Sequence, residues 1–340
     1  MRSPELLTTL LKNVSRSFYL TLRVLPAPIR PQIGLAYLLA RATDTIADTA
    51  LVSAGERLAA LRELQSRISG QRAEPLEFGQ FAERQDLRAE RILLEQSEAA
   101  LAALREFSDA DQECIRRVLS VITRGQELDL ERFGQSSASS LAALATDEDL
   151  DDYTYRVAGC VGKFWTEMCL AHLRTRRALS AEALFEKGIR FGKGLQLINI
   201  LRDLPADLRQ GRCYIPEQRL LGLGLQPRDL LDSANHARFQ PLYLEYLSKA
   251  EGHLEAGWAY TNALPKSWAR VRLACAWPIL IGARTIQKLK QSEVLDPAGR
   301  VKISRAEVKS IIFQSVCRYP WSGAWNQLFD SARAGGGKMA

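Results

Sequence analysis

Residues 196–207 read QLINILRDLPAD, and residues 37–48 read YLLARATDTIAD. Each stretch holds two aspartates in a D-x-x-x-D pattern within a run rich in leucine, isoleucine and alanine. An α-helix advances about 100° per residue, so side chains at positions i, i+4, i+7 and i+11 of the second-quoted stretch, counted from Tyr37, fall within roughly 60° of arc, and the first-quoted stretch has a similar geometry. We therefore expect two apolar helices, each with a narrow acidic face.

Each of the two faces has two carboxylates one helical turn apart, with polar side chains beside them. They consist of Tyr37, Arg41, Asp44 and Asp48 in one stretch and Gln196, Asn199, Asp203 and Asp207 in the other. Carboxylates at this spacing can share a divalent cation, and the lack of nearby His or Cys favours Mg²⁺ over zinc. The apolar neighbours indicate interior helices, where bare carboxylates are costly unless paired or metal-bound.

The alternative is that these are exposed acidic faces. A third D-x-x-x-D, Asp147 with Asp151, lies in the acidic run DEDLDD, and we interpret it as a solvated helix start. Arginines accompany the two main pairs, and guanidinium groups bind phosphate oxygens in a bidentate manner. Together they indicate a diphosphate pocket, although each arginine taken singly could form an ordinary salt bridge.

The rest of the 340-residue chain shows helical periodicity almost everywhere and no convincing alternation of the strand type. Its turns are too short for interdomain linkers, so we expect one domain over residues 1–332 and a disordered tail over 333–340. The net charge of +7 is scattered and no nucleic-acid-binding motif is present, so we expect no nucleic-acid partner. The glycine pair in FGKGLQ follows no strand, which argues against a dinucleotide-binding fold.

Six stretches resemble the squalene/phytoene synthase family, with bacterial squalene synthases as the nearest branch. They are SRSF (15–18), YLLARATDTIAD (37–48), YTYRVAGCVG (153–162), GKGLQLINILRDLPADLRQGRCYIP (192–216), CAWP (275–278) and VKIS (301–304). The resemblance implies an all-α isoprenoid synthase fold, a single helical domain around a central cavity. It also implies transfer between two farnesyl diphosphates with Mg²⁺ and NADPH.

Residue roles follow from the same resemblance. Mg²⁺ ligands would be Asp44, Asp48, Asn199, Asp203 and Asp207. Substrate diphosphates would be contacted by Ser15, Arg16, Tyr37, Arg41, Gln196, Arg202 and Arg212. Tyr153, Tyr155 and Arg156 would lie near the reacting carbons, with the proton acceptor left open. Lys302 and Arg305 are the basic candidates for the phosphates of NADPH.

The expected reaction is head-to-head condensation to presqualene diphosphate, followed by NADPH-dependent reduction to squalene. One alternative is a relative that stops at presqualene diphosphate, or makes hydroxysqualene or a phytoene-type product without NADPH. Another is a non-catalytic assembly factor, which the retention of all four aspartates disfavours. We expect a cytoplasmic protein, peripherally associated with the inner face of the membrane because its substrate and product are lipids.

Two positions depart from the family pattern, and the first of them carries an expectation. Pro205 lies between the second pair of aspartates and should weaken or end that helix, leaving Asp207 on a looser turn. Lys163 stands where related bacterial sequences often have glutamate.

Overall fold

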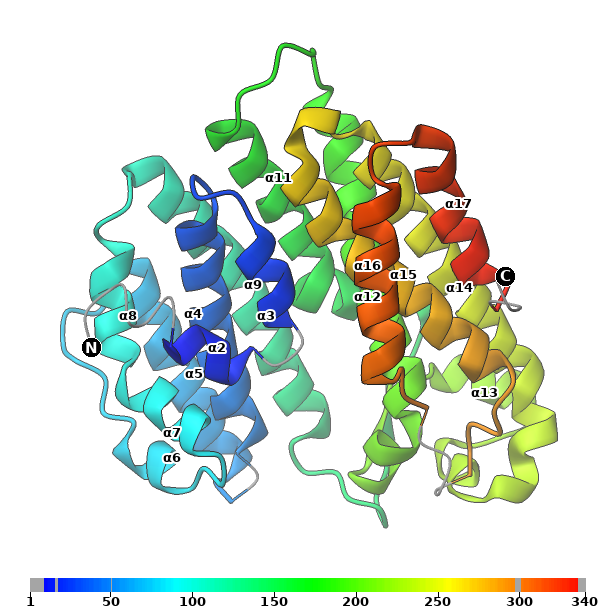
Figure 1. The fold of residues 1–340 in the computed structure, drawn as a ribbon. Helices are drawn as coiled ribbons and strands as arrows, with labels where there is room; N and C mark the ends of the chain where they lie inside the picture. Colours follow the sequence, from blue (N-terminus) through cyan, green and yellow to red (C-terminus); the bar gives the residue numbers. More distant parts are fainter. Residues whose placement is uncertain (1–8, 16–17, 50, 297–300, 336–340) are drawn as a thin grey trace. The chain divides into compact units, whose positions relative to one another are not determined.

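A computed structural model describes residues 9–15, 18–49, 51–296 and 301–335 (Figure 1). In these residues the chain is predominantly helical, and its two named strands, β1 (Ala142–Ala143) and β2 (Arg212–Cys213), pair in parallel. The predicted all-α class is confirmed. The chain divides into two compact units, residues 1–135 with 164–174 and residues 136–163 with 175–340.

The first unit is built around helix α4, which packs against α5, α7, α8 and α9 (Figure 1). Its helices are α2 (Leu11–Val14), α3 (Phe18–Val24), α4 (Arg30–Asp48), α5 (Ala54–Ser69), α6 (Gly79–Glu83), α7 (Arg88–Glu95), α8 (Ser97–Leu104) and α9 (Asp109–Phe133). Ser53 and Glu56 form a capping box that starts α5, and the Ser108 side chain caps α9. Helix α11 (Cys160–His172) contributes residues to both units.

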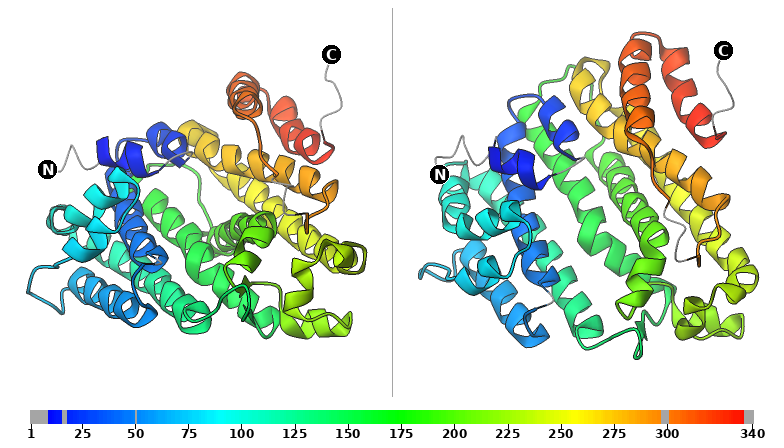
Figure 2. Two further views of the ribbon diagram at one scale, coloured as in Figure 1. Left: turned by 90° about the horizontal axis from the view of Figure 1, so that it is seen from below. Right: turned by 60° about the horizontal axis from the view of Figure 1, so that its bottom comes forward.

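The second unit is built around α12, which packs against α14 and α15. Its helices are α10 (Asp147–Thr154), the π-helical η2 (Tyr155–Gly159), α12 (Ala181–Arg209), α13 (Glu217–Gly222), η3 (Pro227–Leu231), η4 (Ser233–Asn235), α14 (His236–Ala263), η5 (Lys266–Trp268), α15 (Ala269–Lys290), α16 (Arg305–Arg318) and α17 (Ser322–Arg333). Figure 2 shows α16 at the edge of this unit, beside α15 and α17.

Glycines set the close contact between α12 and the segment η2–α11. A Cβ added to Gly162 would lie 1.9 Å from the carbonyl oxygen of Gly188, and one added to Gly192 would lie 2.2 Å from that of Ala158. No side chain fits at either position, because real Cβ contacts are longer than 3.0 Å. The glycines of FGKG lie inside α12, and Gly192 allows the close packing of this helix against Ala158.

The single domain over 1–332 stays a prediction. In the expected tail, Arg333 ends α17, while residues 336–340 lie outside the described residues.

Candidate active site

The first acidic face lies on α4, which carries all four of its predicted residues on one continuous helix. The buried side of the helix holds apolar residues such as Leu38 and Leu39. Asp44 is half-buried, with 46% of its side-chain surface exposed, and Asp48 is exposed. The predicted single face is confirmed, but its acids are only partly buried, because they lie on the side of α4 opposite the apolar one.

Asp44 is held by two neighbours. Arg41 lies 3.7 Å from its Oδ2, and the Nε2 of Gln126 on α9 donates a hydrogen bond to its Oδ1. Although solvent reaches nearly half of its side chain, desolvation by the surrounding protein and repulsion from Asp48 raise the pKa of Asp44 to about 7. A bound cation would relieve this repulsion and favour the ionised carboxylate.

Arg41 has a second carboxylate partner, Glu90 on α7, and its Nη2 donates a hydrogen bond to Oε1 of that glutamate. Burial works to lower the pKa of Arg41, but the charges of Asp44 and Glu90 outweigh it and raise that pKa. The guanidinium therefore stays positively charged beside Asp44.

The second acidic face lies on α12, which likewise carries its four predicted residues in one helix. Asp203 is 36% exposed and Asn199 is exposed. Arg202 donates two hydrogen bonds to Asp203, of 2.9 Å from Nε and 2.5 Å from Nη2. Hydrogen bonding to Asp203 and the charge of Asp207 raise the pKa of Arg202. Each acidic face thus has an arginine next to its first aspartate.

Pro205 does not end this helix, and the expected loose turn at Asp207 is wrong. Helix α12 continues to Arg209. A proline lacks the N–H that would bond the carbonyl four residues earlier, here that of Leu201. The hydroxyl of Tyr243, buried on α14, donates to that carbonyl at 3.0 Å. A donor from a neighbouring helix thus replaces the bond that the proline removes.

Arg212 follows α12 through a tight turn. Gly211 has φ +83°, and a Cβ there would lie 2.4 Å from the backbone nitrogen of Ser137, so glycine is required. Arg212 then enters β2, in register with Ala142 of β1. The pairing fixes the course of the chain at Arg212, five residues after Asp207.

The predicted tyrosines take different environments. The ring of Tyr153 stacks on that of Tyr214, with centroids 4.8 Å apart. The Tyr153 hydroxyl donates to the Tyr214 hydroxyl at 3.4 Å. Tyr155 and Arg156 begin the π-helical turn η2, a geometry frequent at functional sites. Arg156 donates from Nε to Asp152 at 2.7 Å.

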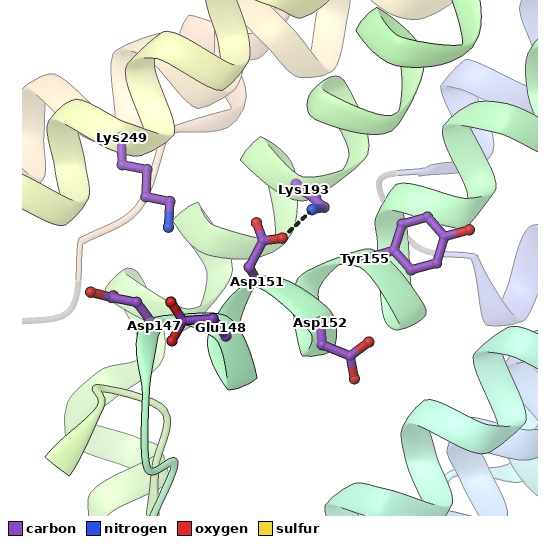
Figure 3. Close-up of a pocket in the computed structure, with 7 residues that line it drawn as sticks. All are labelled: Asp147, Glu148, Asp151, Asp152, Tyr155, Lys193 and Lys249. Atoms are coloured by element: carbon purple, nitrogen blue, oxygen red, sulfur yellow. Dashed lines mark hydrogen bonds and ion pairs between the residues drawn. The ribbon is translucent and has the colours of Figure 1, made fainter. Parts of the chain in front are cut away.

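A pocket of about 500 Å³ lies on the second unit and has Tyr155 on its wall (Figure 3). It is lined by Asp147, Glu148, Asp151, Asp152, Tyr155, Lys193 and Lys249. Lys193 donates to Asp151 at 2.6 Å, whereas Lys249 points towards Asp147 and Glu148 (Figure 3). The hydroxyl of Tyr155 points away from the other labelled side chains (Figure 3).

Asp147 in this pocket has a structural role. Arg219 donates to its Oδ2 at 2.8 Å and Tyr246 to its Oδ1 at 2.7 Å. Burial works to raise the pKa of Asp147, but these hydrogen bonds lower it below its ordinary value. The predicted helix start is confirmed, since α10 begins at Asp147, but the carboxylate is bonded to protein rather than merely solvated.

Lys302 and Arg305 are both exposed near the start of α16. The carbonyl of Lys302 accepts a hydrogen bond from Lys288 at 3.1 Å. Ser304 between them caps α16 in a capping box with Glu307. Both side chains are therefore available to an anion, beside an N-terminus already occupied by a carboxylate.

The remaining predicted positions are near the N-terminus and at Lys163. Ser15 is buried, and its hydroxyl donates to the carbonyl of Leu11 at 2.5 Å. Arg16 lies outside the described residues. Lys163 stands 5.7 Å from the ring centroid of Phe185, a cation–π contact.

The donor set fits Mg²⁺ in kind, since hard carboxylate oxygens are available on each face. Among the described residues, no three side chains of His, Cys, Asp or Glu form a complete metal site. Mg²⁺ commonly binds through one or two carboxylates with phosphate oxygens completing its octahedron. The aspartate pairs fit that mode of binding.

The sequence did not predict two residues that contact the first acidic face, Gln126 and Glu90. Each contacts an α4 side chain from a different helix, 82 and 49 residues away along the chain. Helical spacing carries no signal for such contacts.

Comparison with known proteins identifies the family of the chain. The squalene/phytoene synthase family model matches residues 11–307. The chain therefore belongs to the squalene/phytoene synthase family.

Curated relatives include both branches of that family. A bifunctional lycopene cyclase/phytoene synthase of Phaeosphaeria nodorum is 27% identical over 299 residues, 87% of this chain and 47% of the relative. A squalene synthase of Eremothecium gossypii is 28% identical over 214 residues, 62% of this chain and 45% of the relative. The chain spans about half the length of these relatives.

Solved structures agree on the fold. TcSQS in complex with a ligand matches with a TM-score of 0.74 at 19% identity, covering 98% of each chain. The squalene synthase HpnC of Alicyclobacillus acidocaldarius matches with a TM-score of 0.61 at 18% identity, covering 86% of this chain and 94% of HpnC. The predicted isoprenoid synthase fold is confirmed.

Proposed function

We propose that this protein condenses two farnesyl diphosphates head to head into presqualene diphosphate and reduces this with NADPH to squalene. One observation carries the proposal: both D-x-x-x-D faces have an arginine directly beside the first aspartate, Arg41 3.7 Å from Asp44 and Arg202 bidentate to Asp203. Carboxylates for a cation next to guanidinium groups for phosphate oxygens are what a Mg²⁺–diphosphate ligand requires.

Asp44 and Asp48 on α4, and Asp203 and Asp207 with Asn199 on α12, would hold Mg²⁺. When bound, Mg²⁺ supplies Lewis-acid stabilisation of the charge that develops on a departing diphosphate. The arginines bind the same phosphate oxygens and orient the leaving group.

The other predicted residues have supporting roles in this proposal. Tyr37, Gln196 and Arg212, with Ser15 and Arg16, contact substrate diphosphates. Tyr153, Tyr155 and Arg156 lie near the reacting carbons, and one of them accepts the proton whose loss closes the cyclopropane ring.

The metal assignment is tested by replacing single aspartates. Asp44→Ala and Asp203→Ala should each lower turnover by roughly three orders of magnitude or more, since each removes charge that the transition state needs. Both side chains are partly exposed, so the circular dichroism spectrum should be unchanged. Asp330→Ala, an exposed aspartate on α17, is the matched control. Full turnover of either variant at saturating Mg²⁺ would contradict the assignment.

A phytoene-type product, or an arrest at presqualene diphosphate, is the second candidate. It is favoured by the curated relatives, several of which are phytoene synthases, such as the 15-cis-phytoene synthase of Synechocystis sp., 27% identical over 245 residues. Incubation of the purified protein with farnesyl or geranylgeranyl diphosphate, with and without NADPH, and identification of the products decide between them. Squalene formed only with NADPH supports our proposal, whereas the same product with and without NADPH refutes the reductive step.

Lys302 and Arg305 are proposed to hold the phosphates of NADPH. Neutralising both should spare cyclopropane formation and impair reduction, so that presqualene diphosphate accumulates at limiting NADPH. Arg228→Ala, which removes an exposed arginine on η3 of the same unit, controls for loss of surface charge. Unchanged NADPH dependence in the double variant would place the nicotinamide site elsewhere.

A further inference from the structure

Helix α16 presents large apolar side chains to solvent. Phe313 is 70% exposed and Val316 49% exposed, and Trp321, just beyond the helix, is 65% exposed. Phe313 and Val316 are three residues apart and therefore share one side of the helix. Exposed apolar groups of this size on one helix and at its end are uncommon on soluble proteins and mark interaction sites.

The opposite side of α16 is fixed to its own unit. Ser315 is fully buried and accepts a hydrogen bond of 2.9 Å from the indole nitrogen of Trp277 on α15. The helix packs against α15 and α17, as Figures 1 and 2 show. Phe313 and Val316 are therefore held facing outward by the rigid attachment of the other side.

The same outward side is positively charged towards its start. Arg305 and Lys309 precede Phe313 at intervals of four residues, which places all three on one face, and both are exposed. Between residues 305 and 321 the sequence has one acid, Glu307. That acid is engaged by Lys288 at 2.9 Å and by the backbone of Ser304 at 2.8 Å.

We propose that this face, formed by Arg305, Lys309, Phe313 and Val316 together with the exposed Trp321 just beyond the helix, docks the protein on an anionic lipid bilayer. Aromatic side chains favour the boundary between headgroups and acyl chains, and basic side chains favour anionic lipid phosphates. Amphipathic helices with this combination lie in the membrane plane rather than crossing it. Among the described residues, no helix is long and apolar enough to cross a bilayer.

A second copy of this chain is a poorer occupant than lipid. Two identical basic faces would repel each other, and the chain as a whole carries a net charge of +7. A stable protein interface also buries about 800 Å² on each partner, which is far more than three apolar side chains provide. The charge of the face therefore selects an anionic surface.

Trp321 supplies an intrinsic probe. All six tryptophans lie within the described residues, and Trp321 alone among them is exposed. We expect acrylamide to quench it in solution, and vesicles of phosphatidylcholine with about one third phosphatidylglycerol to protect it. Vesicles of phosphatidylcholine alone, or high salt, should protect it much less because the charge attraction is absent or screened.

Vesicle flotation then measures the contribution of each part of the face. Phe313→Ser with Trp321→Ser should weaken binding about tenfold or more, and Lys309→Glu about fivefold or more. The matched controls are Leu51→Ser, an isolated leucine that is 75% exposed, and Arg228→Glu, and both should bind as the wild type does. No substrate is present, so the result is independent of the proposed reaction.

Two results would overturn the proposal. One is that the wild type does not float with anionic vesicles, or that the Phe313 and Leu51 variants bind them equally well. The other is concentration-dependent self-association in sedimentation without lipid, abolished by the Phe313 variant, which would make a second copy the occupant.

Discussion

The bond between Tyr243 and Leu201 supports the proline inside α12, and this support is measurable. Pro205 leaves the Leu201 carbonyl without its helical donor, and the Tyr243 hydroxyl occupies it at 3.0 Å. Tyr243 is 1% exposed, so water cannot readily take its place. Tyr243→Phe therefore removes the side-chain donor that the structure places on this carbonyl.

The loss in free energy of unfolding caused by Tyr243→Phe depends on whether residue 205 has an N–H. With Pro205 present, Tyr243→Phe leaves a buried carbonyl unsatisfied, at a cost of about 1–3 kcal/mol in the free energy of unfolding. In a Pro205→Ala background the alanine N–H can bond Leu201, so the same change should cost only about 0.5–1 kcal/mol. We expect a coupling of about 1–2 kcal/mol between the two substitutions.

A double-mutant cycle by urea denaturation, followed by circular dichroism, measures this coupling. Tyr246→Phe is the control, because Tyr246 lies on the same helix but bonds Asp147 instead. It should lower stability by the same amount with proline or alanine at position 205. If Tyr243→Phe also costs the same in both backgrounds, the hydroxyl does not compensate for the proline and our reasoning is refuted.

Three further outcomes are expected. Gly162→Ala should lower the free energy of unfolding by about 1–3 kcal/mol or more, because its methyl group would meet the Gly188 backbone at 1.9 Å. The control is Gly252→Ala on α14, where nothing lies within 4 Å and the change should raise the free energy of unfolding by up to about 1 kcal/mol. Equal melting temperatures of the two variants would contradict the packing argument. Gln126→Leu should raise the Mg²⁺ concentration for half-maximal turnover about tenfold or more, since Gln126 orients Asp44, and an unchanged Mg²⁺ requirement would remove that role. The backbone of Ser304 and the side chain of Lys288 lower the pKa of Glu307 to about 2. Ionised Glu307 therefore contributes its full stabilisation of the folded state above the unfolded pKa of about 4.3, and this contribution falls progressively at lower pH. The advantage of wild type over Glu307→Gln in thermal melts should accordingly shrink from about pH 5 to about pH 3, and a constant difference would contradict it.

The sequence alone determined the helical class, the family and the two acidic faces. Each of these rests on information contained within a few helical turns or on short motifs. The D-x-x-x-D spacing places Asp44 with Asp48, and Asp203 with Asp207, on one side of any α-helix whatever surrounds it. Such local geometry needs no knowledge of neighbouring elements, so these predictions held.

Tertiary structure decided what surrounds those faces. Gln126 reaches Asp44 across 82 residues of chain, and Tyr243 reaches the carbonyl opened by Pro205 across 42. Side-chain exposure was also decided there: apolar neighbours predicted that Asp44 would be buried, yet the face that carries it is half open to solvent. Periodicity fixes which side of a helix a residue occupies, but only the packing of other helices fixes what that side meets.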